Sequence, residues 1–111
     1  MVIRGDIFLA DLGDPIGHEQ AFRRPVMVVS AQRWLNTDPP VVATLAITRT
    51  RRDWPEHVEI EPGSSGLRSV SYLTCEDIRA ISPLRFDRQL GRVDPVVMAR
   101  VDVILRRLLL D

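Results

Sequence analysis

The pattern of hydrophobic and polar positions along the chain predicts several short β-strands. Apolar residues either alternate with polar ones or run continuously with many β-branched members, and clusters of Gly, Pro, Asn and Asp separate these segments. The predicted strands cover residues 3–12, 25–30, 41–48, 57–60, 69–75 and 89–93. The segments between them predict a loop at 13–23, one helical turn at 31–35 and a charged loop at 49–56. Residues 77–82 either continue or bend the strand before them.

The C-terminal segment predicts the one clear helix. Asp94 fits the N-cap position, and Pro95 fits the first helical position, where its missing N–H is not needed. Apolar residues then recur three and four positions apart, which produces one apolar stripe. The stripe consists of Val97, Val101, Ile104, Leu105 and Leu108. Short strands followed by one helix predict a mainly β, α+β fold: a small twisted antiparallel β-barrel or sheet that the C-terminal helix partly covers.

The length and composition indicate one domain, residues 1–111, with 45% hydrophobic residues and one modest core. A domain of this size leaves much apolar surface uncovered, so we expect it to pair with a second copy or a partner. No stretch approaches membrane-spanning length, and the N-terminus lacks the basic and apolar regions of a signal peptide. We therefore expect a cytoplasmic protein without membrane contact.

The charge balance excludes general binding of nucleic acid over the whole surface. The 15 basic and 15 acidic residues give zero formal net charge, so any nucleic-acid site must be a local basic patch. Every basic residue is Arg, which matches phosphate well, although a GC-rich coding sequence explains the same bias. Cys75 is the only cysteine, which excludes an intramolecular disulfide and a cysteine-rich metal site. Because His18 and His57 also lie far apart in the sequence, we expect no metal and no cofactor.

Polar residues capable of chemistry gather where predicted strands begin or end, a place where a rigid scaffold often holds functional groups. They are His18, Glu19 and Gln20 in the first loop, Arg23 and Arg24 before Pro25, Thr48 and Arg49, and Glu76 and Asp77 with Arg79. An Arg at a strand end is positioned to stabilise negative charge, and a Thr hydroxyl there can donate a hydrogen bond to a phosphate oxygen.

Each of these residues also has an ordinary structural explanation. Arg24 is equally a surface residue beside a strand, Thr48 a β-former, and His18 an incidental loop residue. Glu76 and Asp77 are adjacent and would face opposite sides of a strand, which disfavours a paired-carboxylate site. The residues taken one by one therefore predict a polar, Arg-rich mouth on a small β-fold and no particular reaction.

The loop of residues 49–56 has the same two interpretations. It is either a solvated charged loop or an RNA groove, where Arg binds phosphate and Trp54 stacks on a base. Cys75 next to Glu76 is expected to be an inert, packed thiol, because a neighbouring carboxylate raises the pKa of a thiol.

Taken together, the motifs resemble the MazF/PemK family of toxins. The resemblance rests on Arg4-Gly5-Asp6-Ile7-Phe8, Gly17-His18-Glu19-Gln20, Arg23-Arg24-Pro25-Val26, Ile47-Thr48, Cys75-Glu76-Asp77-Ile78-Arg79, Leu90-Gly91-Arg92 and Val101-Asp102. These motifs follow one another in the family's order and spacing over nearly the whole chain. Any single motif would be weak, whereas the whole set is specific.

The resemblance implies a β-barrel of the MazF/CcdB type that forms a homodimer with an RNA groove along the interface. It implies the toxin of a type II toxin–antitoxin system, a sequence-specific, metal-independent endoribonuclease that leaves 2′,3′-cyclic phosphate and 5′-hydroxyl ends on single-stranded RNA. The partner that it implies is a cognate antitoxin, whose disordered acidic tail would lie in the Arg-lined groove.

The resemblance also implies roles for individual residues. The family's catalytic Arg falls on Arg24 and its catalytic Thr or Ser on Thr48. The substrate-binding residues that we expect are His18, Glu19, Gln20, Arg49, Glu76 and Arg79. Thr74 stands where PemK-type toxins carry an Arg, which disfavours a PemK-style acid–base pair with Glu76. Asp77 replaces the usual Gln and adds negative charge near the groove.

Two other functions are compatible with this fold. One is a non-enzymatic poison resembling CcdB, which shares the fold and binds a DNA topoisomerase through its C-terminal helix. The other is a toxin whose activity has decayed. The presence of both Arg24 and Thr48 favours the endoribonuclease.

Overall fold

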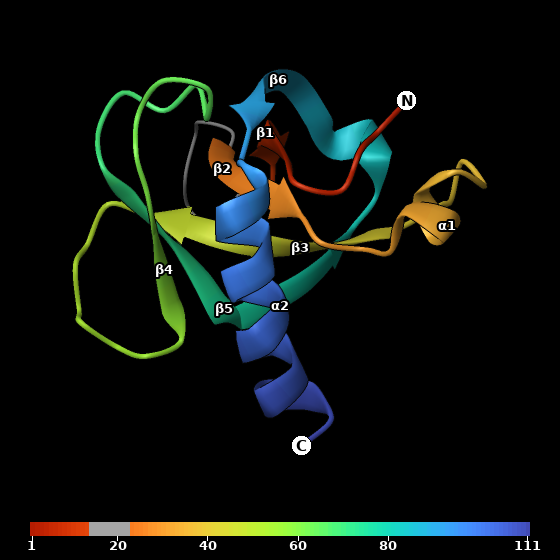
Figure 1. The fold of residues 1–111 in the computed structure, drawn as a ribbon. Helices are drawn as coiled ribbons and strands as arrows, with labels where there is room; N and C mark the ends of the chain where they lie inside the picture. The colour runs from red at the N-terminus through yellow and green to blue at the C-terminus, as the bar shows by residue number, and fades with distance from the viewer. Residues whose placement is uncertain (14–22) are drawn as a thin grey trace.

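A computed structural model describes residues 1–13 and 23–111, which form one antiparallel sheet and a long C-terminal helix (Figure 1). The strands are β1 Asp6–Asp11, β2 Arg23–Val28, β3 Val42–Thr48, β4 His57–Ile60, β5 Ser71–Ile81 and β6 Phe86–Arg92. The helices are α1 Gln32–Leu35, the short 3-10 turn η1 Pro83–Arg85 and α2 Pro95–Leu109. The strands pair in the order β4-β5-β3-β2-β1-β6. The predicted mainly β fold with a C-terminal helix is confirmed.

The strand boundaries differ from the sequence prediction mainly in β5. This strand runs on to Ile81, through the segment that the sequence left as either a continuation or a bend. Residues 76–80 are all exposed, so their side chains carry no alternating apolar signal, although β3 pairs with their backbone. Strand β6 likewise begins at Phe86, three positions before the predicted 89–93, and β2 begins at Arg23, ahead of Pro25.

Strand β5 both continues and bends. Leu45 of β3 pairs with Ile78, whereas the next residue, Ala46, pairs with Thr74. The residues of β5 between these two partners therefore bulge out of the ladder, and a bulge bends its strand and turns side chains outward. The bulge consists of Cys75, Glu76 and Asp77, of which Cys75 is buried and both carboxylates are exposed.

The main core lies between the sheet and α2, which crosses one face of the sheet in Figure 1. The buried side chains of this core include Ile7, Met27, Leu45, Ile47, Leu73 and Val101. Helix α2 begins as predicted, because the Asp94 side chain accepts a hydrogen bond from Val97 N at 2.9 Å and Pro95 occupies the first turn. Within the described residues, no helix is long and apolar enough to cross a membrane.

The opposite face of the sheet is apolar at one end and polar at the other. At the apolar end, Val28, Val42 and Leu35 are buried, and the rings of Phe8 and Phe86 stack with their centroids 4.3 Å apart. Side chains alternate between faces along a strand, and Leu45 and Ile47 of β3 face the core. Ala46 and Thr48 therefore point to the opposite face, toward its polar end.

The sheet is open rather than a closed barrel, and a loop connects its two edges. Strands β4 and β6 form its two edges, and the loop that follows β4 contacts β6, where Arg92 N donates to Ser64 O at 3.0 Å. Gly66 has φ of +74°, and a Cβ on it would overlap the carbonyl of Leu90. A Cβ on Gly91 would overlap the backbone of Ser64 in the same way. Two glycines therefore allow the loop and the edge strand to touch backbone to backbone.

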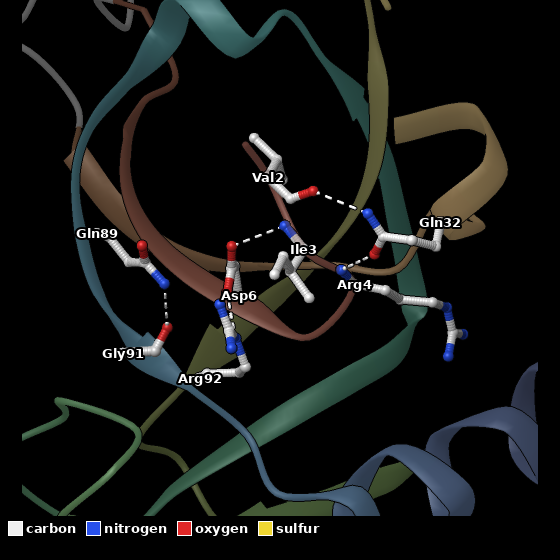
Figure 2. A network of polar contacts seen from close by, with 8 residues as sticks. All are labelled: Val2, Ile3, Arg4, Asp6, Gln32, Gln89, Gly91 and Arg92. Carbon is white, nitrogen blue, oxygen red and sulfur yellow. Dashed lines mark hydrogen bonds and ion pairs between the residues drawn. The ribbon is translucent and has the colours of Figure 1, made fainter. Parts of the chain in front are cut away.

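The N-terminal motif Arg4-Gly5-Asp6 has a structural role (Figure 2). The Asp6 carboxylate is 1% exposed and accepts hydrogen bonds from Ile3 N at 2.8 Å and from Arg92 Nε at 2.6 Å. The Gln32 side chain accepts from Arg4 N at 2.9 Å and donates to Val2 O at 3.1 Å. These bonds fix the N-terminal arm between α1 and β6.

Arg4 extends this network to the C-terminal helix. Its Nε donates to Val29 O at 2.9 Å, and its Nη2 lies 2.6 Å from Asp102 Oδ1. This ion pair is partly buried. The ion pair therefore joins the N-terminal arm to the middle of α2.

Candidate active site

The strand register brings the two predicted catalytic residues together. Strands β2 and β3 pair Val26 with Ala46. Continuing this register by two residues sets Arg24 opposite Thr48, and directly opposite residues point to the same face of a sheet. Thr48 in turn pairs with Tyr72 of β5. Arg24, Thr48 and Tyr72 therefore form a row across three strands on the face away from α2.

The Thr48 hydroxyl is oriented within this row. Its oxygen accepts a hydrogen bond from Thr50 N at 3.1 Å. A hydroxyl that accepts one bond still has its own proton to donate, so Thr48 is a donor toward a ligand on this face. Arg24 is exposed. The pair thus offers a guanidinium and a hydroxyl from neighbouring rigid strands, a combination that binds phosphate oxygens.

The two adjacent arginines at the start of β2 point to opposite faces. Arg24 pairs with Ala10 of β1, and Arg23 pairs with Asp11. Neighbouring residues in a strand alternate between faces. Arg23 Nε lies 3.9 Å from Asp87 Oδ2 of β6, an exposed and weak contact. Only Arg24 therefore belongs to the row.

Tyr72 and Arg51 extend the row, and the sequence interpretation gave neither a specific role there. Glu59 of β4 pairs with Tyr72 from the other side. A hydrogen bond from Arg51 Nε to Asp53, 2.7 Å long, raises the pKa of Arg51, with further contributions from Tyr72 and Glu59. The Arg51 guanidinium therefore lies near the Tyr72 end of the row, where it is paired with the Asp53 carboxylate. Tyr72 alternates with Val70 and Thr74 in the predicted strand, but only the three-dimensional register reveals its neighbour.

Arg79 lies on the same face but farther along the sheet. It pairs with Thr44, whose Oγ1 donates to Arg79 O at 2.9 Å. The guanidinium of Arg79 reaches Leu12 O at 3.5 Å, at the end of β1. Arg49 directly follows Thr48 and is exposed. Three further predicted substrate-binding residues lie outside the described residues: His18, Glu19 and Gln20.

Glu76 belongs to a second polar cluster. Its Oε2 lies 2.9 Å from Nε2 of His57, whose side chain is 3% exposed. Trp54 packs against His57 with 5.1 Å between ring centroids. In the sequence, His57 is remote from His18, and its position at the start of a predicted strand is the one signal that it carries. The structure therefore ties Glu76 to His57 on β4, outside the row of Arg24 and Thr48.

Comparison with known proteins identifies the family. The family model described as "PemK-like, MazF-like toxin of type II toxin-antitoxin system" matches residues 3–109. The chain belongs to this family. The chain is also 32% identical over 107 residues to Endoribonuclease EndoA of Bacillus subtilis (strain 168), a match that covers 96% of the chain and 92% of that relative. These two matches confirm the predicted family and the predicted class of enzyme.

Solved structures with the same fold include toxin–antitoxin complexes. A mycobacterial endoribonuclease in complex with its cognate antitoxin has a TM-score of 0.78 and 25% identity, over 96% of this chain and 93% of that one. MazE–MazF from Deinococcus radiodurans (Form-II) has a TM-score of 0.78 and 24% identity with the same coverage, which shows the fold. The predicted MazF-type fold is therefore confirmed.

The single cysteine of this MazF-like toxin has the properties of a packed thiol. Cys75 is fully buried. Burial, followed by the nearby Glu76 and Glu56 carboxylates, raises the pKa of its thiol to about 11. Cys75 is therefore protonated at neutral pH and unsuited to act as a nucleophile.

Among residues 1–13 and 23–111 of the toxin, no cluster of three or more His, Cys, Asp or Glu side chains could hold a metal ion. The positively charged groups near the row are the guanidinium groups of Arg24, Arg49 and Arg51, and the carboxylates of Asp53 and Glu59 lie near its Tyr72 end.

Proposed function

We propose that this toxin is a sequence-specific endoribonuclease that cleaves single-stranded RNA without a metal ion and leaves 2′,3′-cyclic phosphate and 5′-hydroxyl ends. The register of β2 and β3, which sets Arg24 opposite Thr48 when it is continued from the pair Val26–Ala46, is the observation that carries the proposal. The match to EndoA over nearly the whole chain supports the same reaction class.

In the proposed reaction, the 2′-oxygen of one nucleotide attacks the adjacent phosphorus while the bond from phosphorus to the 5′-oxygen breaks. Negative charge grows on the non-bridging oxygens, where a preorganised guanidinium has its largest effect. Arg24 stabilises this charge, and the Thr48 hydroxyl donates a hydrogen bond to a non-bridging oxygen. Because Arg24 supplies positive charge directly, the reaction requires no metal ion.

The reaction also moves two protons, one from the 2′-hydroxyl and one to the departing 5′-oxygen. His18 is our candidate for moving them, because imidazole exchanges a proton near neutral pH. We assign RNA binding to Arg49 and Arg79, which supply charge around the row, and to Glu19, Gln20 and Glu76. The Arg24–Thr48 row and the match to EndoA both favour this function over a CcdB-like topoisomerase poison.

Cleavage in a chelator tests the proposed function. The purified toxin, incubated with a long RNA in excess EDTA, is expected to cut at a defined set of sequences at an undiminished rate. The 5′-ends should accept phosphate from a polynucleotide kinase, and the 3′-ends should resist extension until the cyclic phosphate is removed. Loss of cleavage in EDTA that Mg²⁺ or Zn²⁺ restores would contradict the proposed mechanism.

We propose that the toxin acts as a homodimer with the RNA groove between its protomers. Large apolar side chains remain on the surface of the single chain, as expected of a small domain that pairs with a second copy. Among the most exposed are Leu84, Val96, Leu109 and Leu110. We also propose a cognate antitoxin as a partner, since a related mycobacterial toxin is solved in such a complex.

The antitoxin is expected to compete with RNA. A disordered acidic tail would pair its carboxylates with Arg49, Arg51, Arg52 or Arg79, the same donors that bind RNA phosphates. Addition of a peptide that matches the tail should therefore raise the apparent Kd for an uncleavable RNA in proportion to peptide concentration. Simultaneous binding of both, without mutual weakening, would rule out this competition.

A further inference from the structure

Beside the row, an exposed indole and a carboxylate both contact the buried ring of His57. Trp54 is 48% exposed, although it packs against the buried ring of His57. The guanidinium of Arg52 lies over the Trp54 ring, 5.6 Å from its centroid. Trp54 is therefore an open aromatic surface with a cation on it, the arrangement on which bases of single-stranded nucleic acid stack.

His57 holds the carboxylate next to this surface. Nδ1 of His57 is buried and has no hydrogen-bond partner among the described residues, so Nε2 makes the ring's one polar contact, to Glu76 Oε2. A carboxylate oxygen can only accept, which places the hydrogen on Nε2. The His57 ring is held by its position on β4 and by its contact with Trp54. It therefore fixes the position of the Glu76 carboxylate at the bulge of β5.

The second oxygen of Glu76 is then available to a ligand. Oε1 has no partner among residues 1–13 and 23–111, and the Glu76 side chain is 35% exposed. A base stacked on Trp54 would offer its edge to this oxygen. Adenine, cytosine and guanine carry exocyclic amino groups that donate to a carboxylate, whereas uracil offers only its N3–H, flanked by two carbonyl oxygens that a carboxylate repels.

We propose that Trp54, His57 and Glu76 form a subsite for one nucleobase of the RNA, in which Trp54 stacks on the base and Glu76 selects a base with an exocyclic amino group (adenine, cytosine or guanine) over uracil. His57 is a positioning residue, because it acts by fixing Glu76. The inference rests on the proposed function, since it names the recognition of the same substrate.

The test measures binding, so it does not depend on catalysis. Uncleavable 2′-O-methyl oligomers of adenosine, cytidine and uridine are titrated into the homodimeric toxin carrying Trp34→Phe, so that the fluorescence reports Trp54 alone. We expect quenching on binding, and affinity for the adenosine and cytidine oligomers on the order of tenfold above that for uridine. Trp54→Ala, measured by anisotropy of labelled oligomers, should weaken binding of all three.

The ratio of the affinities for the adenosine and uridine oligomers separates base selection from changes in the overall affinity for RNA. Glu76→Gln and His57→Phe should both reduce the adenosine-to-uridine ratio to near one, because the first replaces the acceptor and the second releases it while keeping the ring volume. Asp77→Asn is the matched control: it removes the same charge from the same bulge, so it should strengthen binding of all oligomers alike and leave the ratio unchanged.

Each outcome decides the proposal. A ratio that Glu76→Gln leaves unchanged, an unchanged Trp54 fluorescence, or an absence of binding to all three oligomers would overturn the subsite. A toxin that shows this binding pattern but cleaves no RNA would keep the subsite and refute the proposed function. A toxin that cleaves RNA but lacks this binding pattern would refute the subsite and keep the proposed function.

Discussion

Replacement of Arg24 by alanine is expected to slow cleavage of one RNA substrate on the order of hundredfold to thousandfold, because a preorganised donor to the transition-state charge is lost. Thr48→Ala should have a smaller effect, since a hydroxyl contributes a neutral hydrogen bond. Arg24→Lys should rescue little activity, because Lys keeps the charge but lacks the planar pair of donors. Single-turnover cleavage measures all three.

Arg23→Ala is the matched control for this series. Arg23 neighbours Arg24 but points to the opposite face of β2, so its loss should reduce mainly the salt-sensitive affinity for RNA. Circular dichroism should show all variants folded, because these side chains are outside the core. A near wild-type rate for a folded Arg24→Ala variant would show that Arg24 is not catalytic and would favour a CcdB-like poison.

Gly66→Ala is expected to cost the toxin roughly 2–5 kcal/mol of unfolding free energy. An L-residue at positive φ is strained by about 1–2 kcal/mol, and the added Cβ would also collide with the backbone of Leu90, a form of overpacking that typically costs about 1–3 kcal/mol. Because the obstacle is backbone, it cannot move aside as a side chain would.

Gly63→Ala separates the two contributions. Gly63 also has positive φ, at +108°, but a Cβ there meets nothing within 4 Å. It should therefore lose only the strain, about 1–2 kcal/mol. Urea denaturation of both variants gives the difference between their unfolding free energies, which measures how closely the loop contacts β6. Equal losses for the two variants would mean that the loop and β6 are not in contact.

The sequence predicts the well-packed parts of this fold best. Residues 41–48 and the helix after Asp94 carry strong periodic signals, and both elements lie within a residue of the predicted boundaries. The second half of β5 escapes prediction because its exposed side chains contribute no periodicity, while its backbone pairs with β3 across a bulge. Pairing of this kind depends on residues distant in the sequence, which local patterns do not contain.

The candidate site likewise contains residues that the sequence predicts and residues that it does not. Arg24 and Thr48 are recognisable as polar residues at strand ends, and the resemblance to a family adds their roles. Tyr72 and His57 are not recognisable, because each acquires its significance from a partner on another strand. The hydrogen bond between His57 and Glu76 joins residues 19 positions apart, and the bulge that aims Glu76 at His57 has no sequence signature.

Pairing of β1 with β6 also affects when the toxin can become active. The ion pair between Asp6 and Arg92 joins residues 86 positions apart, so the first strand to leave the ribosome must wait for the last. Contacts between such distant segments form slowly, and β1 cannot pair with β6 until that strand has been synthesised. A nascent toxin therefore has an unfinished sheet, and an interval separates its translation from its first possible RNA cut. A cell that makes both proteins from one transcript has this interval in which to supply the antitoxin.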